Sequence, residues 1–178
     1  MAGMSTLFIG LTIAFFYTRF KMGIDPIRPP LIFLFNTLIL LGSSYTISRA
    51  INSYKADNTE RYIQSLWMTL MLSFVFLIGQ YFGWSEMLDQ KVRLDSGTGA
   101  AYLYLLSGVH FLHVIAGIPF LVQFIITSRK KMKEPVSVLV YFSDPAKKLR
   151  LRLLSMYWHF LDGLWIFLVL VLFFMWFF

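Results

Sequence analysis

The feature that most constrains the fold is a series of long stretches that carry no Asp, Glu, Lys or Arg. Four such runs cover 1–18, 29–48, 62–85 and 96–128, and a fifth, 153–178, is broken only by Asp162. A helix that crosses the hydrocarbon core of a bilayer needs roughly 20 mostly apolar residues. We therefore predict an all-α integral membrane protein, a bundle of five transmembrane helices over approximately 2–18, 29–48, 62–85, 99–128 and 153–177.

Composition supports a membrane solvent. The chain has 178 residues, of which 58% are hydrophobic and 14% charged, whereas soluble domains average about 45–50% apolar and about 25% charged residues. A soluble domain of this length could not bury so much apolar surface. The composition excludes a disordered chain, a disulfide-stapled secreted module and a cytosolic enzyme, and it predicts a single transmembrane domain over 1–178.

Local signals set several helix boundaries. The run 96–128 predicts one long or tilted helix that begins at the turn 96–99 and tolerates Pro119 inside it. Pro29 and Pro30 stand at the start of the second run, where proline costs no intrahelical hydrogen bond. The segment 57–60 supplies N-cap candidates for the third helix. The first run has neither a basic leader nor a small-residue cleavage site, so we expect it to be retained.

The distribution of basic residues predicts the orientation, because cytoplasmic loops are enriched in Lys and Arg. The loops after the second and fourth helices share one side and carry eleven of the sixteen Lys and Arg residues. The other side carries Arg19, Lys21, Arg28, Lys91 and Arg93. We therefore expect a cytoplasmic N-terminus, a periplasmic C-terminus, and a basic cytoplasmic loop over 129–152.

That loop has an apolar centre, 136–142, between two basic clusters. A short interfacial segment or hairpin would explain the pattern, and so would a loop held against partner proteins. The net charge of +7 is mostly a matter of topology and of attraction to anionic lipid. We expect no nucleic-acid partner, since no folded domain is present to carry such a site.

Polar groups inside membrane helices are the first candidates for function. Here they are Asn36, Gln64, Gln80, His110, His113, Gln123, His159 and Asp162. His110 and His113 are spaced i, i+3 and share one helix face. A haem or zinc site would need further ligands, and the chain offers one other histidine and no cysteine. Interhelical hydrogen bonding is the favoured interpretation, and a His-ligated membrane haem or metal protein is the alternative.

His159 and Asp162 form the only charged constellation inside a predicted crossing. A carboxylate in lipid is costly, so Asp162 should pair with His159, accept bonds from a neighbouring helix, or stay protonated. This pair has two readings, a structural bond between helices and a proton relay. Elsewhere we find no thiol nucleophile, phosphate-binding loop, Gly-x-Ser-x-Gly or zinc-protease motif.

Two late motifs resemble a known family. YWHFLDGLWIFL at 157–168 is similar to the pattern Tyr-Trp-His-Phe-Val-Asp-x-x-Trp-x-Phe-Leu, and YLYLLSGVHFLHVIAG at 102–117 to an aromatic stretch followed by Thr-Gly-x-His-Gly-x-His-Val and a glycine. Both patterns belong to subunit III of the haem-copper oxidases. Upstream, PLIFLFNT at 30–37 and GQYFGW at 79–84 also resemble the family, so the resemblance spans essentially the whole chain.

The resemblance implies the short, five-helix form of a family whose longer members carry two more helices at the N-terminus. It implies an accessory subunit of an aerobic respiratory chain, in a multi-pass arrangement in the bacterial cytoplasmic (inner) membrane. Such a subunit packs against the catalytic subunit I and other subunits of a proton-translocating cytochrome c or quinol oxidase. It binds phospholipid and supports turnover and proton uptake, while haem and copper lie in partner subunits. A subunit III-like component of a nitric oxide reductase is the alternative.

The resemblance assigns no catalytic, cofactor or metal residue to this chain. It marks as structural or interface positions His110, His113, Gly117, Tyr157, Trp158, His159, Asp162, Trp165, Asn36 and Gln80. Three positions depart from the family pattern. Two buried glutamates of the family fall at Met4 and Gly83, which weakens the expectation that this subunit conducts protons itself. The glycine between the paired histidines is Phe111, which predicts different packing there.

Overall fold

The computed structural model of the chain describes residues 2–23, 28–93, 97–132 and 135–177. The residues Met1, Ser96 and Phe178 at the ends of predicted runs, and 133–134 of the predicted basic loop, lie outside this part. The described residues form six helices and no strand: α1 (Ala2–Met22), α2 (Ile32–Lys55), α3 (Thr59–Asp89), α4 (Thr98–Lys131), α5 (Pro135–Ser143) and α6 (Pro145–Phe177). Four of them, α1, α3, α4 and α6, are long and apolar enough to cross a membrane. The chain is therefore all-helical with four candidate spans by these criteria, and α2 falls outside them.

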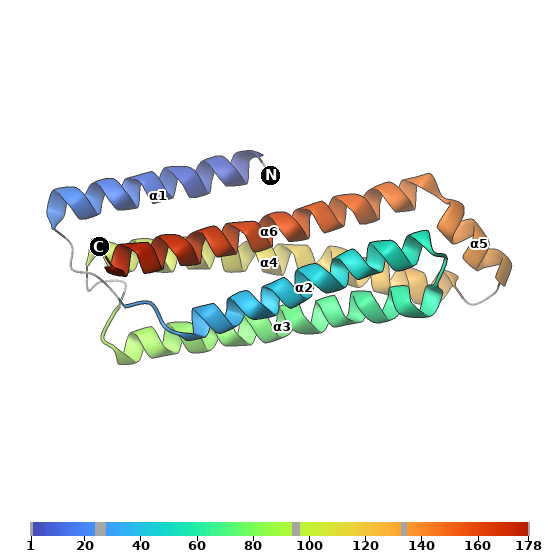
Figure 1. Cartoon of the computed structure of the whole chain (residues 1–178), viewed down its shortest axis with the longest axis horizontal. Helices are drawn as coiled ribbons and strands as arrows, with labels where there is room; N and C mark the ends of the chain where they lie inside the picture. The colour runs from blue at the N-terminus through green and yellow to red at the C-terminus, as the bar shows by residue number, and fades with distance from the viewer. Residues whose placement is uncertain (1, 24–27, 94–96, 133–134, 178) are drawn as a thin grey trace.

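The five long helices form an elongated bundle in which successive helices run in opposite directions (Figure 1). The most extensive contact joins α2 to α3, and α6 packs on both α2 and α4. The first helix, α1, stands apart from α2 and α3 and contacts mainly α4. The short helix α5 lies at the end of the bundle where α2 and α4 finish and α6 begins.

Two boundary predictions are confirmed. Asn58 caps α3, since its side-chain oxygen accepts a hydrogen bond from the Arg61 backbone N–H at 2.9 Å. The part of the run 96–128 from Thr98 onward lies in one uninterrupted helix, α4, with Pro119 inside it. Proline fits within a long membrane helix because neighbouring groups can satisfy the carbonyl that it leaves without a donor.

The structure corrects the expected loop over 129–152. Helix α4 continues to Lys131, α5 occupies most of the apolar centre, and α6 already begins at Pro145. Long apolar runs mark where a helix can enter lipid, but the helical backbone continues into charged sequence as long as capping and packing allow. The predicted spans therefore end before their helices do or begin after them, except that 29–48 begins three residues before α2, so Pro29 and Pro30 precede the helix, and 153–177 ends with α6.

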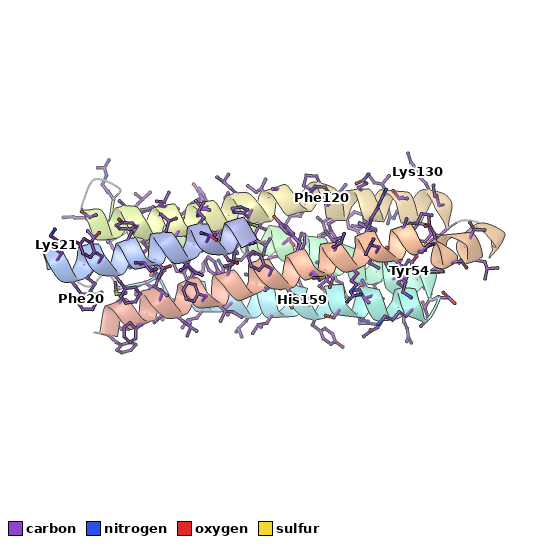
Figure 2. The ribbon with its side chains drawn as sticks, turned by 90° about the horizontal axis from the view of Figure 1, so that it is seen from above. Phe20, Lys21, Tyr54, Phe120, Lys130 and His159 are labelled. Atoms are coloured by element: carbon purple, nitrogen blue, oxygen red, sulfur yellow. The ribbon has the colours of Figure 1, made fainter. Side chains whose placement is uncertain are left out.

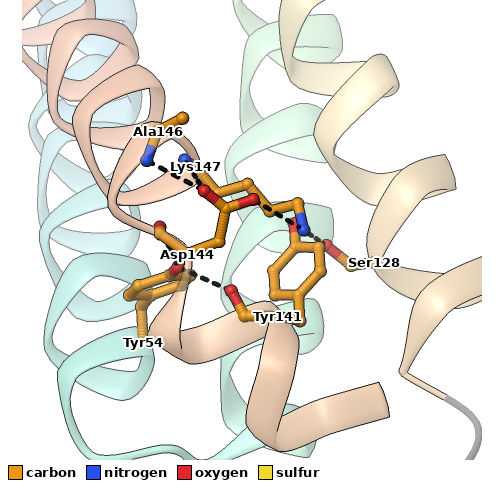
Figure 3. Close-up of polar contacts among 6 residues, drawn as sticks. All are labelled: Tyr54, Ser128, Tyr141, Asp144, Ala146 and Lys147. Carbon is orange, nitrogen blue, oxygen red and sulfur yellow. Dashed lines mark hydrogen bonds and ion pairs between the residues drawn. The ribbon is translucent and has the colours of Figure 1, made fainter.

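A hydrogen-bonded cluster fixes α5 against the bundle (Figure 3). The Tyr54 hydroxyl at the end of α2 donates to the Tyr141 backbone oxygen at 3.0 Å, and the Tyr141 hydroxyl lies 3.1 Å from Ser128 Oγ of α4. The Lys147 ammonium lies 4.3 Å from the centre of the Tyr141 ring. Three helices thus meet on Tyr141, which is 1% exposed.

Asp144 starts α6. Its Oδ1 accepts hydrogen bonds from the backbone N–H groups of Ala146 at 2.9 Å and Lys147 at 3.4 Å. The next residue, Pro145, occupies the first helical position, where proline is favoured. Asp144 Oδ2 lies 3.1 Å from Lys147 Nζ. The Lys147 side chain, with the two backbone donors, holds the pKa of the Asp144 carboxyl below its ordinary value of 3.8.

We predict that this cap depends on pH and charge. A carboxyl whose pKa is lowered by folding stabilises the folded state fully at pH values above the pKa of the unfolded chain. This contribution is lost as the pH falls through the lower pKa of the folded protein. The protection of the amides at 146–148, which is the intrinsic exchange rate divided by the measured one, should therefore hold down to pH 3.8 and fall below it. Asp144→Asn, which caps without charge, should remove the pH dependence, and Asp144→Ala should give fast exchange throughout. Equal exchange in all three proteins would contradict the assignment.

Candidate functional site in the polar interior of the bundle

The motif residues are brought together around Trp165 of α6. The Trp165 ring packs on Phe76 of α3 and His110 of α4, each with ring centres 5.1 Å apart, and on Phe33 of α2 at 5.5 Å. The Trp165 indole N–H donates to Thr37 Oγ1 at 3.1 Å. One indole therefore contacts three other helices, and it is fully buried.

Three polar side chains at this level have no hydrogen-bond partner. Asn36, Gln80 and His110 are each 0% exposed, and neither the amide groups nor the ring nitrogens are paired among the described residues. Asn36 lies directly against the α3 backbone, because a Cβ added to Gly79 would overlap its side-chain oxygen. Interhelical hydrogen bonding through the His110 ring, the favoured prediction, is not found here.

His113 has different surroundings from His110. Its Nδ1 lies 2.7 Å from the Val109 carbonyl of its own helix, and its ring centre is 6.4 Å from that of Phe8 in α1. Its backbone carbonyl accepts a hydrogen bond from the Tyr157 hydroxyl at 2.8 Å. The side chain is therefore bonded within α4, and the link from α4 to α6 is made by its main chain.

The contact between α4 and α6 depends on Gly117. A Cβ added there would lie 2.9 Å from ring carbons of both Tyr157 and Trp158. The Trp158 indole N–H donates in turn to Ser43 Oγ of α2 at 3.0 Å. Gly117 thus lets two aromatic rings lie against the α4 backbone while one of them reaches a third helix.

His159 and Asp162 lie on the seam between α2 and α6. The imidazole Nδ1 is 2.6 Å from Ser44 Oγ and Nε2 is 3.2 Å from Ser48 Oγ. Asp162 is 4% exposed, and both of its carboxyl oxygens have no hydrogen-bond partner among the described residues, although Ser44 is the hydroxyl beside it. Figure 2 places His159 midway along the bundle. The residues do not pair directly with each other.

The structure explains two departures from the family pattern. Phe111 packs on the Trp84 indole with ring centres 5.1 Å apart, and that indole donates to Ser107 Oγ at 3.0 Å. Gly83 has no room for a side chain, since a Cβ there would lie 2.6 Å from Cε1 of Phe33. Phe111, larger than the family's glycine, therefore fills a contact between α4 and α3. Gly83, smaller than the family's glutamate, belongs to a closely packed contact between α3 and α2.

The sequence analysis missed the serines and threonines of α2. Ser43, Ser44 and Ser48 receive or share bonds from the α6 motif, and Thr46 Oγ1 lies 2.8 Å from Thr69 Oγ1 of α3. Their signal was available, because Ser44 and Ser48 are one helical turn apart and share a face. It was passed over because hydroxyls are common in membrane helices.

Metal ligation finds no geometric support in the described ranges. No group of three or more His, Asp or Glu side chains lies close enough there to hold a metal ion. The three histidines face different surroundings: aromatic rings for His110, its own helix for His113, and the serines of α2 for His159. A haem or metal centre built on all three would need a different arrangement of α4 and α6.

A second feature is a groove between α4 and α6. It has a volume of about 490 Å³ and is lined mostly by apolar side chains, together with Gln123 and Arg150. A smaller cavity of about 160 Å³ shares Gln123, Phe124 and Arg150 with it and adds Lys131 and Lys147. In Figure 2, Phe120 of the groove lies nearer the middle of the bundle, and Lys130 of the neighbouring basic segment lies towards its end. The apolar groove is therefore continuous with a cavity whose lining includes the cationic side chains of Lys131, Lys147 and Arg150.

These features define a helical membrane protein whose buried polar side chains hold its helices together, with no metal cluster in its described part. Comparison with known proteins gives the family: residues 6–177 match the model of cytochrome c oxidase subunit III. The chain belongs to the cytochrome c oxidase subunit III family.

Individual relatives agree with the match. The chain is 32% identical over 146 residues to cytochrome c oxidase subunit 3 of Papio hamadryas, covering 82% of this chain and 51% of the relative. It is 34% identical over 149 residues to that of Locusta migratoria, covering 84% and 52%. The subunit of Paracentrotus lividus is 33% identical, with 82% and 51% covered. The chain thus spans about half the length of the curated relatives it matches.

We predict that Gly117→Ala loosens the contact between α4 and α6. The added methyl forces Tyr157 or Trp158 to move, at a cost of about 1–3 kcal/mol for overpacking. Gly108→Ala is the matched control on the same helix, because a Cβ there meets nothing within 4 Å. Thermal unfolding of the purified proteins, followed by circular dichroism, should show a lower midpoint for Gly117→Ala only. Equal midpoints for the two variants would contradict the packing argument.

Proposed function

We propose that this chain is an accessory subunit III of a haem-copper terminal oxidase in aerobic respiratory electron transport. It packs against the catalytic subunit and supports turnover and proton uptake, while haem and copper are held by partner subunits. The observation that carries the proposal is the family match over 6–177. It is joined by the position of the motif residues, which build helix contacts instead of a cofactor site.

The proposal includes five membrane crossings, with α2 as the fifth. Its hydropathy is lowered by small polar residues, but Ser43, Thr46 and Ser53 are buried. Its outward residues include Leu34, Phe35, Leu38, Leu41 and Tyr45, all exposed. Lipid would meet this apolar face, whereas the hydroxyls face protein. Five alternating helices and the excess of Lys and Arg at one end support a cytoplasmic N-terminus and a periplasmic C-terminus.

The bacterial cytoplasmic membrane as the location rests on the resemblance to the short form alone. The nitric oxide reductase alternative keeps the same fold and family, and no residue of this chain separates the two complexes. A His-ligated haem protein is disfavoured, because His110 and His113 have such different neighbours.

We expect the chain to copurify with a large haem-copper subunit when extracted in gentle detergent through a terminal tag. The complex should show a haem spectrum, and the chain separated from it should show none. Oxygen consumption by the complex would favour the oxidase, and nitric oxide consumption would favour the reductase. A chain that purifies without any haem-containing partner would refute the proposal.

Bound phospholipid is part of the proposed role, and the groove between α4 and α6 supports it. The apolar side chains of the groove suit an acyl chain. Arg150, with Lys131 and Lys147 of the neighbouring cavity, suits a phosphate group. A basic residue near a membrane surface contributes about 1 kcal/mol to the attraction of anionic lipid.

Arg150→Gln should therefore lower the retained phosphatidylglycerol roughly fivefold, since each 1.4 kcal/mol is a factor of ten. Arg152→Gln is the matched control, because Arg152 lines a separate cavity beside Lys55. Native mass spectrometry of the purified complex counts the bound lipids, with phosphatidylcholine as the zwitterionic comparison. An equal loss in both variants would indicate general surface charge instead of this groove.

A further inference from the structure

The seam between α2 and α6 holds an acid, a hydroxyl and an imidazole in a row. Asp162 is buried at mid-bundle, Ser44 of α2 lies beside its carboxyl, and Ser44 Oγ is 2.6 Å from His159 Nδ1. On the far side of the ring, Nε2 lies 3.2 Å from Ser48 Oγ. A hydroxyl both donates and accepts, so Ser44 can connect the carboxyl with the imidazole.

No charge from a neighbouring helix compensates Asp162. Its carboxyl has no ion pair among the described residues, where the one salt bridge found joins Lys147 to Asp144. The runs of α1, α2 and α4 that pack around α6 carry no Asp, Glu, Lys or Arg within 2–18, 29–48 and 97–128. The titratable side chains in those runs and in the inner part of α6 are His110, His113, Tyr17, Tyr45, Tyr102, Tyr104 and Tyr157.

An uncompensated charge in such a place is costly, unless the group is neutral or a counter-charge forms beside it. The Asp162–Ser44–His159 row offers both states with a single proton. In one state the carboxyl is protonated and the imidazole neutral. In the other, a carboxylate faces an imidazolium across Ser44. Both states have the same net charge.

We propose that Asp162, Ser44 and His159 form a proton-sharing site that holds one exchangeable proton. The transfer requires the Asp162 carboxyl to turn and donate a hydrogen bond to Ser44 Oγ, a bond that is not formed in this structure. It is then balanced within the row: the Asp162 O–H bond breaks as its proton passes to Ser44 Oγ, and the Ser44 hydroxyl proton passes to Nδ1 of His159. A new N–H bond forms on the ring, and the serine remains a neutral hydroxyl. Reversing the two transfers restores the first state.

The two ends of the site differ in burial. His159 is exposed at the side of the bundle, midway along its length, whereas Asp162 is 4% exposed, so the site runs from the interior to the face that meets lipid or a neighbouring subunit. The other histidines lack such a row. His110 is buried among Phe76 and Trp165 without a polar partner, and His113 is bonded to its own helix. The seam is therefore the one place where a described histidine reaches towards a buried acid through a hydroxyl.

This inference goes beyond the proposed function and does not depend on it, because proton sharing is a property of three side chains of this chain. Infrared difference spectroscopy of the purified complex, recorded as pH is stepped, provides the test. Subtracting the spectrum of Asp162→Asn isolates the C=O stretch of the Asp162 carboxyl. Labelling with ¹⁵N-histidine identifies the imidazole bands, with His159→Gln as the reference.

In the unchanged protein, the Asp162 and His159 bands should change together, with a common midpoint. Ser44→Ala should separate the two midpoints, and Ser44→Thr, which keeps the hydroxyl, should restore the common one. Ser48→Ala is the matched control, because it removes the hydroxyl on the other ring nitrogen and should leave the coupling intact. A purely structural seam would not tie the two midpoints to the Ser44 hydroxyl.

Coincident midpoints in Ser44→Ala, or independent midpoints in the unchanged protein, would overturn the proposal. Circular dichroism of each variant checks that the helices remain folded. If Ser44→Ala unfolds, the unchanged protein still provides a test, because independent midpoints there overturn the proposal. These results are separate from copurification, so a complex without shared protons would refute this inference and leave the subunit role standing.

Discussion

A hydroxyl on a membrane helix must find its partner inside the protein, and on α2, the proposed fifth crossing, this requirement decides which way the helix faces. Lipid offers no hydrogen-bonding group to an exposed polar side chain. Ser43 accepts from Trp158 of α6, Thr46 pairs with Thr69 of α3, and Ser44 bonds His159. These contacts tie α2 between α3 and α6 and leave residues such as Leu34, Phe35 and Leu38 facing outward, whereas Phe33 and Leu40 are buried. The least apolar of the five long helices is thus held by hydrogen bonds to two neighbours.

Close approach of the backbones completes what the hydroxyls begin. Hydrophobic attraction between helices is weak in lipid, so packing depends on small residues at the points of contact. Gly79 admits the Asn36 side chain, Gly83 admits Phe33, and Gly117 admits Tyr157 and Trp158. The glycines of α3 therefore complement side chains of α2, and the glycine of α4 complements the aromatic residues of the α6 motif.

Much of the fold could be predicted from the sequence because the apolar runs and the caps are local signals. The Asn58 cap and the unbroken α4 with Pro119 follow from a few adjacent residues. The candidate site was predictable only as a set of residues. That Ser44 would reach His159, or that His110 would meet aromatic rings instead of a hydrogen-bond partner, depends on how helices distant in sequence pack. A short segment at 136–142 was one of the two expectations, and α5 forms there, but its position against the bundle depends on Tyr54 and Ser128 and could not be predicted.

Packing explains why Gly83, one of the two positions where the family resemblance places a glutamate, has no room for a carboxylate. The Cβ position of Gly83 faces the Phe33 ring, so a carboxylate there would require Phe33 to leave the Trp165 cluster. At the contact between α3 and α4, Phe111 packs on Trp84. The interior on this side is filled with aromatic rings, which neither carry nor exchange protons under ordinary conditions. Asp162 lies elsewhere on the seam between α2 and α6, beside the hydroxyl of Ser44. We therefore expect a proton bound within the bundle to lie at Asp162, Ser44 and His159, in the seam between α2 and α6, and not at the position of Gly83.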